Sequence, residues 1–296
     1  MDIIIGSRGS DLALWQAHFV RDQLENLGHQ VTIKIIQTKG DKIQHLSFDK
    51  LEGKGFFTKE IEESLLSKSI DLAVHSHKDL ETTPPEGLKI GAVSYRENPT
   101  DRLLIRKSVA VARNKWQLPD NAVVGTSSAR RKSQILRYCP TVSLKDLRGN
   151  VPTRIDKLRS GQYDAIILAS AGILRLDLDL SDLIEIELDP TEFIPAPAQG
   201  VLGLQIREDD DQLSTILAAL NNSKVETEIG IERSVLKKLH GGCQLPLGVY
   251  CFDGEDGKNV YVSFSPEKNG IGHLLTYQSV NLTQIVPTIL RDLHAL

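Results

Sequence analysis

Three turns that combine arginine with glycine, serine or threonine precede predicted helices. Residues 125–131 (GTSSARR) carry Thr126, Ser128, Arg130 and Arg131, residues 6–10 (GSRGS) carry Arg8 and Ser10, and residues 147–154 (LRGNVPTR) carry Arg148 and Arg154. The free N–H groups and the dipole at a helix start attract anions, and the planar arginine fork donates two parallel hydrogen bonds to a carboxylate. One such turn is equally consistent with a serine cap and a solvated basic face. Three of them favour a shared cleft for a small ligand with several carboxylates.

A lysine and an aspartate, Lys78 and Asp79, follow the apolar run at residues 70–74. This is the end of a strand at which α/β sheets bind ligands, although an arbitrary Lys-Asp pair is more often a surface ion pair. His75 and His77 lie two apart on one strand face and would also suit a metal. No third ligand is spaced nearby, so we expect no metal site.

The three cysteines are an odd number without the paired spacing of a zinc site or a disulfide framework, which predicts free thiols. Cys139 and Cys251 lie beside apolar runs, as core cysteines do, whereas Cys243 follows two glycines in a context that exposes a thiol on a tight turn. By itself this context favours an inert thiol over a nucleophile. The glycine-rich stretches lack the spacing of a nucleotide-binding signature, so we expect no nucleotide cofactor.

Two α/β cassettes must position these residues. The first comprises a predicted strand at residues 2–5, a helix at 12–27 and strands at 31–36, 70–74 and 88–93. The second comprises a strand at 122–124, a helix at 129–138, a strand near 142, a helix that ends at Gly161 and a strand at 165–168. A helix at 225–239, an alternating segment at 260–264 and a helix at 283–293, with Pro287 in its first turns, indicate a smaller α+β part.

The predicted fold class is therefore two α/β domains around a cleft plus a smaller C-terminal α+β domain. A chain of 296 residues is longer than one hydrophobic core usually supports. We expect domain 1 at residues 1–97 and 197–220, domain 2 at 98–196 and domain 3 at 221–296. The polar segment 96–101 and the rigid PAP at 195–197 would form a two-segment hinge.

Composition excludes several classes of protein. Charged residues make up 25% and apolar residues 40%, which argues against long disorder. The net charge of -4 gives no global attraction to nucleic acid, so an anion site has to be a local cluster of cations. No apolar run approaches the roughly 18 residues that cross a bilayer, and Asp2 stands where a signal peptide has a cation. We expect a cytoplasmic monomer with no nucleic-acid or membrane partner.

Seven motifs, in order, resemble the porphobilinogen deaminase (hydroxymethylbilane synthase) family. They are SRGS at 7–10 with LWQ at 14–16, GKGFF at 53–57, HSHKDL at 75–80, GTSSARR at 125–131, LRGNV at 147–151, QG at 199–200 and GGC at 241–243. This highly specific match covers residues 7–243. Asp11, His77 and Glu81 depart from the family pattern, which commonly has proline, Met or Leu, and proline there, and Ala198 is a milder change. None of these departures removes a catalytic group.

The resemblance implies a transferase that condenses four porphobilinogen molecules head to tail, with release of ammonia, into the linear tetrapyrrole hydroxymethylbilane of haem biosynthesis. It implies three α/β domains, of which the first two fold like periplasmic binding proteins. It also implies a dipyrromethane cofactor joined by a thioether to Cys243.

The same resemblance assigns the site residues. Asp79 matches the catalytic carboxylate, which binds the pyrrole N–H and stabilises the cation left by ammonia loss. Arg8, Ser10 and Gln16 match the substrate side, and Arg148 and Arg154 match contacts to both substrate and cofactor. The family positions that bind the cofactor carboxylates are matched by Lys78, Thr126, Ser128, Arg130 and Arg131. Weaker assignments are Lys54, Arg175 and Gln199.

Two other interpretations stay open. A non-catalytic two-domain anion-binding module would use the same helix-end sites, but it would need neither Asp79 nor Cys243. A metal hydrolase would be built on His75 and His77.

Overall fold

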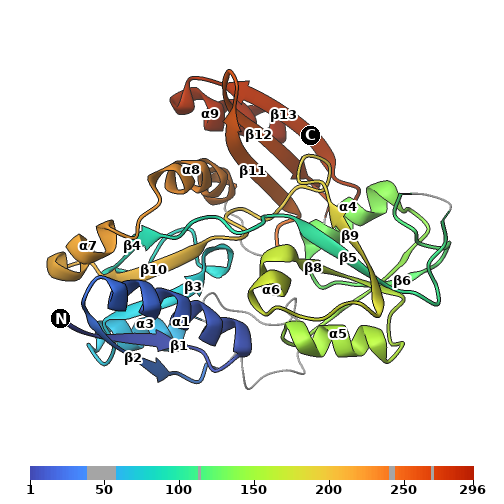
Figure 1. Cartoon of the computed structure of the whole chain (residues 1–296). Helices are drawn as coiled ribbons and strands as arrows, with labels where there is room; N and C mark the ends of the chain where they lie inside the picture. Colours follow the sequence, from blue (N-terminus) through green and yellow to red (C-terminus); the bar gives the residue numbers. More distant parts are fainter. Residues whose placement is uncertain (39–57, 113–114, 240–243, 268–269) are drawn as a thin grey trace. The chain divides into compact units, whose positions relative to one another are not determined.

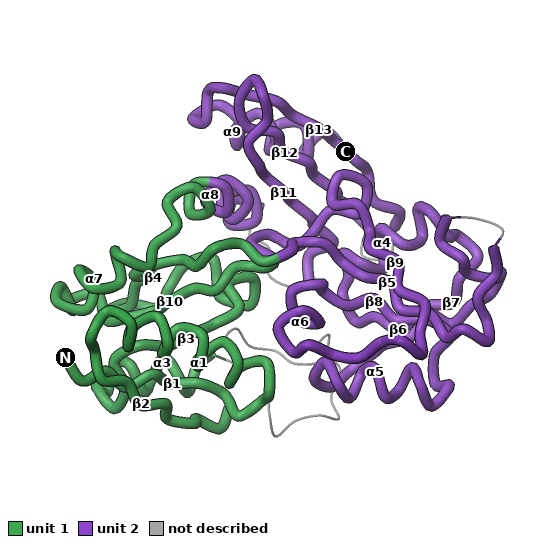
Figure 2. The backbone as a smooth tube through the Cα atoms, viewed as in Figure 1, with its two compact units in different colours: residues 1–97, 200–227 green, residues 98–199, 228–296 purple. Residues whose placement is uncertain are grey.

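The computed structural model describes residues 1–38, 58–112, 115–239, 244–267 and 270–296. The described chain forms two compact units (Figure 2). Unit 1 comprises residues 1–97 and 200–227, and unit 2 comprises residues 98–199 and 228–296. The division into three domains stays a prediction. Among the described residues, no helix is both long and apolar enough to cross a membrane.

Unit 1 is built on a five-stranded sheet with the order β2-β1-β3-β10-β4 (Figure 1). The strands are β1 (Asp2–Ser7), β2 (Gln30–Ile35), β3 (Leu72–Ser76), β4 (Leu88–Val93) and β10 (Leu202–Arg207). β1 pairs in parallel with β2 and β3, whereas β10 is antiparallel to both of its neighbours. The other elements are α1 (Asp11–Asn26), α3 (Lys59–Leu66), α7 (Asp211–Ala218) and the short 3-10 helix η2 (His77–Asp79).

Unit 2 contains a second five-stranded sheet, with the order β7-β6-β8-β5-β9. Its strands are β5 (Asp101–Arg106), β6 (Val123–Gly125), β7 (Ser143–Lys145), β8 (Ala165–Ala169) and β9 (Leu183–Leu188). β6 pairs in parallel with β7 and β8, whereas β5 is antiparallel to β8 and β9. The helices are α4 (Ala129–Tyr138), α5 (Val151–Arg159) and α6 (Ser170–Arg175). Strand for strand, this sheet repeats the arrangement of the sheet in unit 1.

The C-terminal part of unit 2 is a smaller antiparallel sheet, β11-β12-β13. Its strands are β11 (Leu247–Gly254), β12 (Gly257–Phe264) and β13 (His273–Ser279), and α9 (Leu282–His294) follows them. The long helix α8 (Ser223–Lys238) begins in unit 1 and continues in unit 2. Val235 of α8, Val249 of β11 and Ile289 of α9 share one buried cluster. The fold class predicted from the sequence, two similar α/β parts and a smaller α+β part, is confirmed.

Each sheet has its own buried apolar cluster. In unit 1, Ile3 and Leu204 from the strands lie in one cluster with Leu24 of α1. In unit 2, Ile105 and Ile167 lie in one cluster with Ile135 of α4. These separate cores hold the loops at the strand ends, where the candidate site residues lie.

Candidate functional site

In unit 1, the predicted substrate-side residues Arg8 and Ser10 lie where β1 ends and α1 begins, and Gln16 lies in the second turn of α1. Because β1 and β3 are parallel neighbours, that point lies beside the end of β3. The side-chain amide of Gln16 donates a hydrogen bond to Ser76 Oγ at 2.9 Å, which links α1 to the last residue of β3. Two of the predicted motifs therefore meet at one edge of the sheet.

Lys78 and Asp79 lie in η2, directly after β3. The backbone N–H of His77 bonds to the carbonyl oxygen of Val201 at 2.9 Å, and the N–H of Leu80 bonds to His77 at 3.2 Å. The Asp79 side chain is exposed and Lys78 is half-buried. An anchored turn thus holds an exposed carboxylate at the edge where Arg8 also lies.

His75 belongs to a buried chain of polar side chains and does not face a metal site. Its Nε2 atom lies 3.1 Å from Gln205 Oε1, and the amide of Gln205 donates to Glu62 Oε1 at 3.1 Å. Thr58 in turn donates to the other oxygen of Glu62 at 3.3 Å. Burial lowers the pKa of His75 to about 4, the bond to Gln205 opposes this shift, and the charge of Arg8 adds to it. His75 is therefore a neutral hydrogen-bond donor at neutral pH.

In unit 2, Thr126 and Ser128 form the turn between β6 and α4. The Ser128 side chain caps α4 by accepting the N–H of Arg131 at 3.4 Å, and Thr126 Oγ1 accepts the N–H of Ser128 at 3.2 Å. Capping leaves other N–H groups of the first helical turn without an intrahelical partner. The structure therefore has the strand-turn-helix geometry that the sequence predicts for an anion site.

The loop that contains Arg148 is tied to this turn. Ser127 Oγ donates to the carbonyl oxygen of Leu147 at 2.9 Å and accepts the N–H of the same residue at 3.1 Å. Asn150 caps α5, and Arg154 Nε donates back to the carbonyl oxygen of Gly149 at 2.7 Å. Two of the arginine-rich turns lie side by side at the carboxyl ends of the parallel strands β6 and β7.

Arg130 and Arg131 converge on one carboxylate, Asp101 at the start of β5. Arg130 Nη1 donates to Asp101 Oδ2 at 2.8 Å, and Arg131 Nη2 and Nε donate to Oδ1 at 2.7 and 3.2 Å. Asp101 is 0% exposed and the two arginines are 4% and 7% exposed. Burial alone would raise the pKa of Asp101, but the two guanidinium groups hold it well below its usual range. The carboxylate therefore stays ionised and the cluster has a net charge of +1.

The weaker assignments have mixed surroundings. Gln199 is fully buried and donates to the carbonyl oxygens of Pro99 and Thr100 at 2.7 and 3.2 Å and to Asp101 Oδ1 at 3.0 Å. Arg175 is buried at the end of α6. Lys54 and Cys243 lie outside the described residues.

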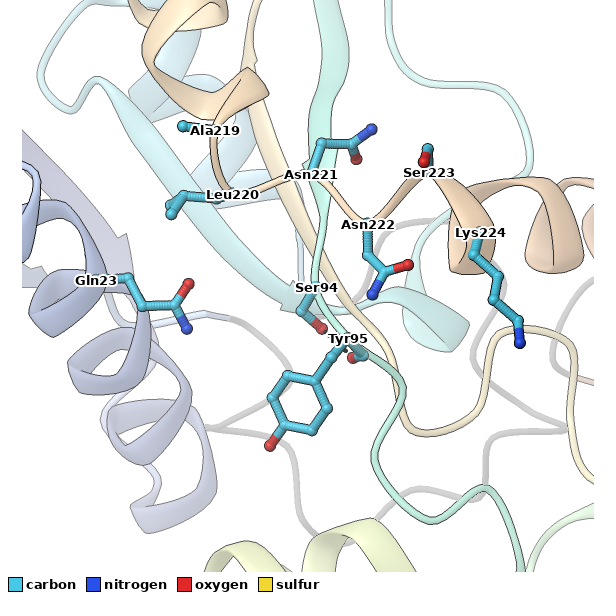
Figure 3. A pocket seen from close by; sticks show the side chains of 9 residues that line it. All are labelled: Gln23, Ser94, Tyr95, Ala219, Leu220, Asn221, Asn222, Ser223 and Lys224. Carbon is cyan, nitrogen blue, oxygen red and sulfur yellow. Dashed lines mark hydrogen bonds between the residues drawn. The ribbon is translucent and has the colours of Figure 1, made fainter.

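Unit 1 also has a hollow of about 390 Å³ (Figure 3). Gln23 of α1, Ser94 and Tyr95 after β4, and residues 219–224 line it. None of these is a predicted site residue. Within the described part of the chain, no group of three or more His, Cys, Asp and Glu side chains is placed to hold a metal ion.

Comparison with known proteins identifies the family. The family model described as "Porphobilinogen deaminase, dipyromethane cofactor binding domain" matches residues 3–215. The porphobilinogen deaminase of Nitratiruptor sp. is 46% identical over 249 residues, which cover 84% of this chain and 78% of that protein. The porphobilinogen deaminase of Syntrophobacter fumaroxidans is 44% identical over 248 residues, or 83% and 78% of the two chains.

The chain belongs to the porphobilinogen deaminase family. The resemblance predicted from the seven motifs is thus confirmed, and the matched region includes both arginine-rich turns of unit 2 as well as Asp79. Among solved structures, the periplasmic VFT2 domain of BvgS from Bordetella pertussis matches 78% of this chain and 93% of its own, with 14% identity and a TM-score of 0.45. A superposition at that level bears on neither fold nor function.

Three buried polar residues of this deaminase family member escape sequence reasoning. In the sequence, Asp101 stands at the end of a polar segment that resembles a linker. Glu62 resembles an ordinary solvent-exposed acidic residue of a helix. Glu232 of α8 is fully buried and accepts the backbone N–H groups of Ala198 at 2.7 Å and Cys251 at 2.8 Å. No local pattern marks these residues, because the partners named above lie at least 19 residues away, apart from Thr58, which is four residues from Glu62.

Proposed function

We propose that this chain condenses four porphobilinogen molecules into hydroxymethylbilane, with release of ammonia, on a dipyrromethane primer joined to Cys243. The observation that carries the proposal is the family match over residues 3–215. It is supported by the local geometry: hydroxyl, N–H and guanidinium donors converge at the start of α4, beside the loop of Arg148. This donor set fits a ligand that carries several carboxylates.

The cofactor side is proposed to comprise residues of the arginine-rich turns of unit 2 together with Lys78, and Lys54 is a weaker assignment. Each dipyrromethane ring carries an acetate and a propionate, and a charge-assisted hydrogen bond contributes about 1.5–3 kcal/mol net. Thr126, Ser128, Arg130 and Arg131 are the proposed carboxylate donors, and their common origin in one turn supports this role. When bound, the dipyrromethane supplies the free pyrrole α-carbon to which the first substrate ring is joined.

The substrate side is proposed to be the edge of the sheet in unit 1. Arg8 and Ser10 would bind the acetate and propionate of porphobilinogen at the start of α1. Gln16 already donates to Ser76, so its contribution includes holding the end of β3. Arg148 and Arg154 are proposed to contact both substrate and cofactor, with Arg175 and Gln199 as weaker contributors.

Asp79 is proposed to stabilise the charge that develops when ammonia leaves porphobilinogen. Its exposed carboxylate would accept the pyrrole N–H, over which the positive charge spreads. A carboxylate about 4 Å from a unit charge, at an effective dielectric constant near 20, contributes about 4 kcal/mol, or roughly a thousandfold in rate. Repeating the step adds rings until water releases the tetrapyrrole.

Intact-mass spectrometry tests this function. The purified protein should carry the mass of two linked pyrroles, and brief exposure to porphobilinogen should produce a ladder of species one ring apart, together with free ammonia. Protein of unmodified mass that gives neither ladder nor ammonia would overturn the proposal in favour of an anion-binding module. A monomeric state in the cytoplasm belongs to the same proposal, and light scattering on a sizing column tests the monomer.

A further inference from the structure

Asp101 accepts four hydrogen bonds from three side chains. Oδ1 receives Nε and Nη2 of Arg131 and the amide of Gln199, and Oδ2 receives Nη1 of Arg130. A carboxylate has about four lone-pair sites, and these three side chains place donors on both of its oxygens, three at Oδ1 and one at Oδ2. Because it is completely buried, water does not compete for any of these bonds.

The two arginines use different edges of their guanidinium groups. Arg131 donates from both atoms of its Nε–Nη2 edge to Asp101 Oδ1. Its Nη1 atom donates to the carbonyl oxygen of Ile167 at 3.0 Å. Arg130 makes both of its bonds through Nη1, to Asp101 and to the carbonyl oxygen of Ile194 at 2.7 Å. Among the described residues, nothing bonds to the Nε–Nη2 edge of Arg130, which is therefore ready for a second carboxylate.

The segment that delivers Gln199 is itself fixed. Ala198 has a left-handed backbone with φ of 62°, a conformation that costs a residue with a side chain about 1–2 kcal/mol. Its N–H is held by Glu232, and Gln134 bonds to both the N–H and the carbonyl oxygen of Ile194, at 2.6 and 2.9 Å. A strained backbone persists only where its surroundings hold it. Here the bonds around Ala198 hold the next residue, Gln199, where its amide reaches Asp101.

We propose that Asp101 is a positioning residue. Its carboxylate, held by Gln199, accepts hydrogen bonds from Arg131 and from Nη1 of Arg130. Arg130 is thereby oriented so that its Nε–Nη2 edge faces a cofactor carboxylate. Of the two arginines proposed above as carboxylate donors, Arg130 then makes the two-point contact with the ligand, and Arg131, whose Nε and Nη2 bond to Asp101, chiefly supports it. The residual charge of +1 on the cluster supplies the attraction for the anion. This inference rests on the proposed function. It assigns different roles to Arg130 and Arg131, which the sequence alone, with two adjacent arginines, does not distinguish.

The experiment follows cofactor assembly in chains made by cells without porphobilinogen, then given porphobilinogen and sampled by intact-mass spectrometry. Gln199→Met keeps the buried volume and removes the amide that bonds to Asp101 and to the carbonyl oxygens of Pro99 and Thr100. The lost bond to the charged Asp101 alone corresponds to about a tenfold slower loading of the cofactor. Asp101→Asn should nearly abolish loading. Glu228→Gln is the matched control, because it removes a buried acid from an ion pair with Lys258 in the same unit, and it should load normally.

A double variant separates positioning from general support of the fold. If Asp101 and Gln199 act through Arg130, Gln199→Met should slow loading no further once Arg130 is lysine, which lacks the planar fork. Circular dichroism confirms that each variant is folded, and Gln199→Met keeps the test valid if Asp101→Asn does not fold. Normal loading of folded Gln199→Met, or additive effects in the double variant, would overturn the inference. Failure of the unaltered chain to gain mass would instead overturn the proposed function.

Discussion

Replacing His75 by glutamine tests the buried polar chain of unit 1. The glutamine amide keeps a donor that reaches Gln205, but it cannot take up a proton. In the folded protein the pKa of His75 is about 4, against 6.5 for the free side chain. Between these two values the unfolded chain binds a proton that the folded chain does not. The stability that neutral His75 contributes is therefore complete above pH 6.5 and is lost as the pH falls toward 4.

The size of the effect follows from this shift. A difference of one pKa unit is worth about 1.4 kcal/mol, so the whole shift corresponds to about 3 kcal/mol, of which about 2 kcal/mol is lost between pH 8 and pH 5. Every other titrating group is common to the two proteins. The gap in unfolding free energy between the His75→Gln variant and the unaltered chain should therefore narrow by about 2 kcal/mol from pH 8 to pH 5.

Urea unfolding at pH 5, 6, 7 and 8 would measure this gap. The chain has two tryptophans, Trp15 in unit 1 and Trp116 in unit 2, so a Trp116→Phe background makes fluorescence report on unit 1. The exposed His18 provides a matched histidine-to-glutamine control, His18→Gln, for the chemical change itself. A His75→Gln variant whose stability falls with pH in parallel with the unaltered chain would refute the assignment of a buried, neutral imidazole.

Three further outcomes are expected. Asp79→Asn should keep fold and cofactor but lower turnover by about a thousandfold, with Asp79→Glu retaining more, and a near-normal rate in the loaded Asn variant would contradict charge stabilisation. Cys243→Ala should lack the added mass of two pyrroles, whereas a Cys139→Ala variant should keep it, since burial raises the pKa of that thiol to about 11. Gly28→Ala should lower the free energy of unfolding by about 1 kcal/mol, and Gly200→Ala by about 3 kcal/mol. Both glycines have positive φ, but only a Cβ at Gly200 would meet a backbone carbonyl oxygen, and equal losses in urea unfolding would refute the clash.

Local patterns in the sequence predict the local elements well. The helix α4 begins and ends at the predicted residues 129 and 138, because a serine cap and an apolar stripe mark it. The strands β5, β9, β10, β11 and β13 and the shorter helices α3, α6 and α7 are not predicted. β5 begins at Asp101, inside the segment interpreted as a linker, and β9 alternates as LIEIEL, a period-two signal that would have revealed it.

The site is predictable only in part for a similar reason. Motif residues such as Ser128 and Asp79 lie at strand ends, which a strand-turn-helix pattern reveals. The partners of Asp101 lie 29, 30 and 98 residues away along the chain, and no local spacing records such a meeting. Sequence reasoning therefore finds the groups that face a ligand more readily than the groups that hold them.

The two sheets share one arrangement of strands, but their strands follow one another along the chain in different orders. This chain order decides when each sheet can be completed during synthesis. The sheet of unit 2 is encoded by one continuous stretch, from β5 at Asp101 to β9 at Leu188. In unit 1, β10 lies between β3 and β4, so β4 has no neighbouring strand in the sheet until residues 202–207 leave the ribosome. Although unit 1 begins at the N-terminus, its sheet can close only after all strands of the second sheet have been made. Until then β3 and β4 have strand edges without a partner in the sheet, and such edges can pair with other chains.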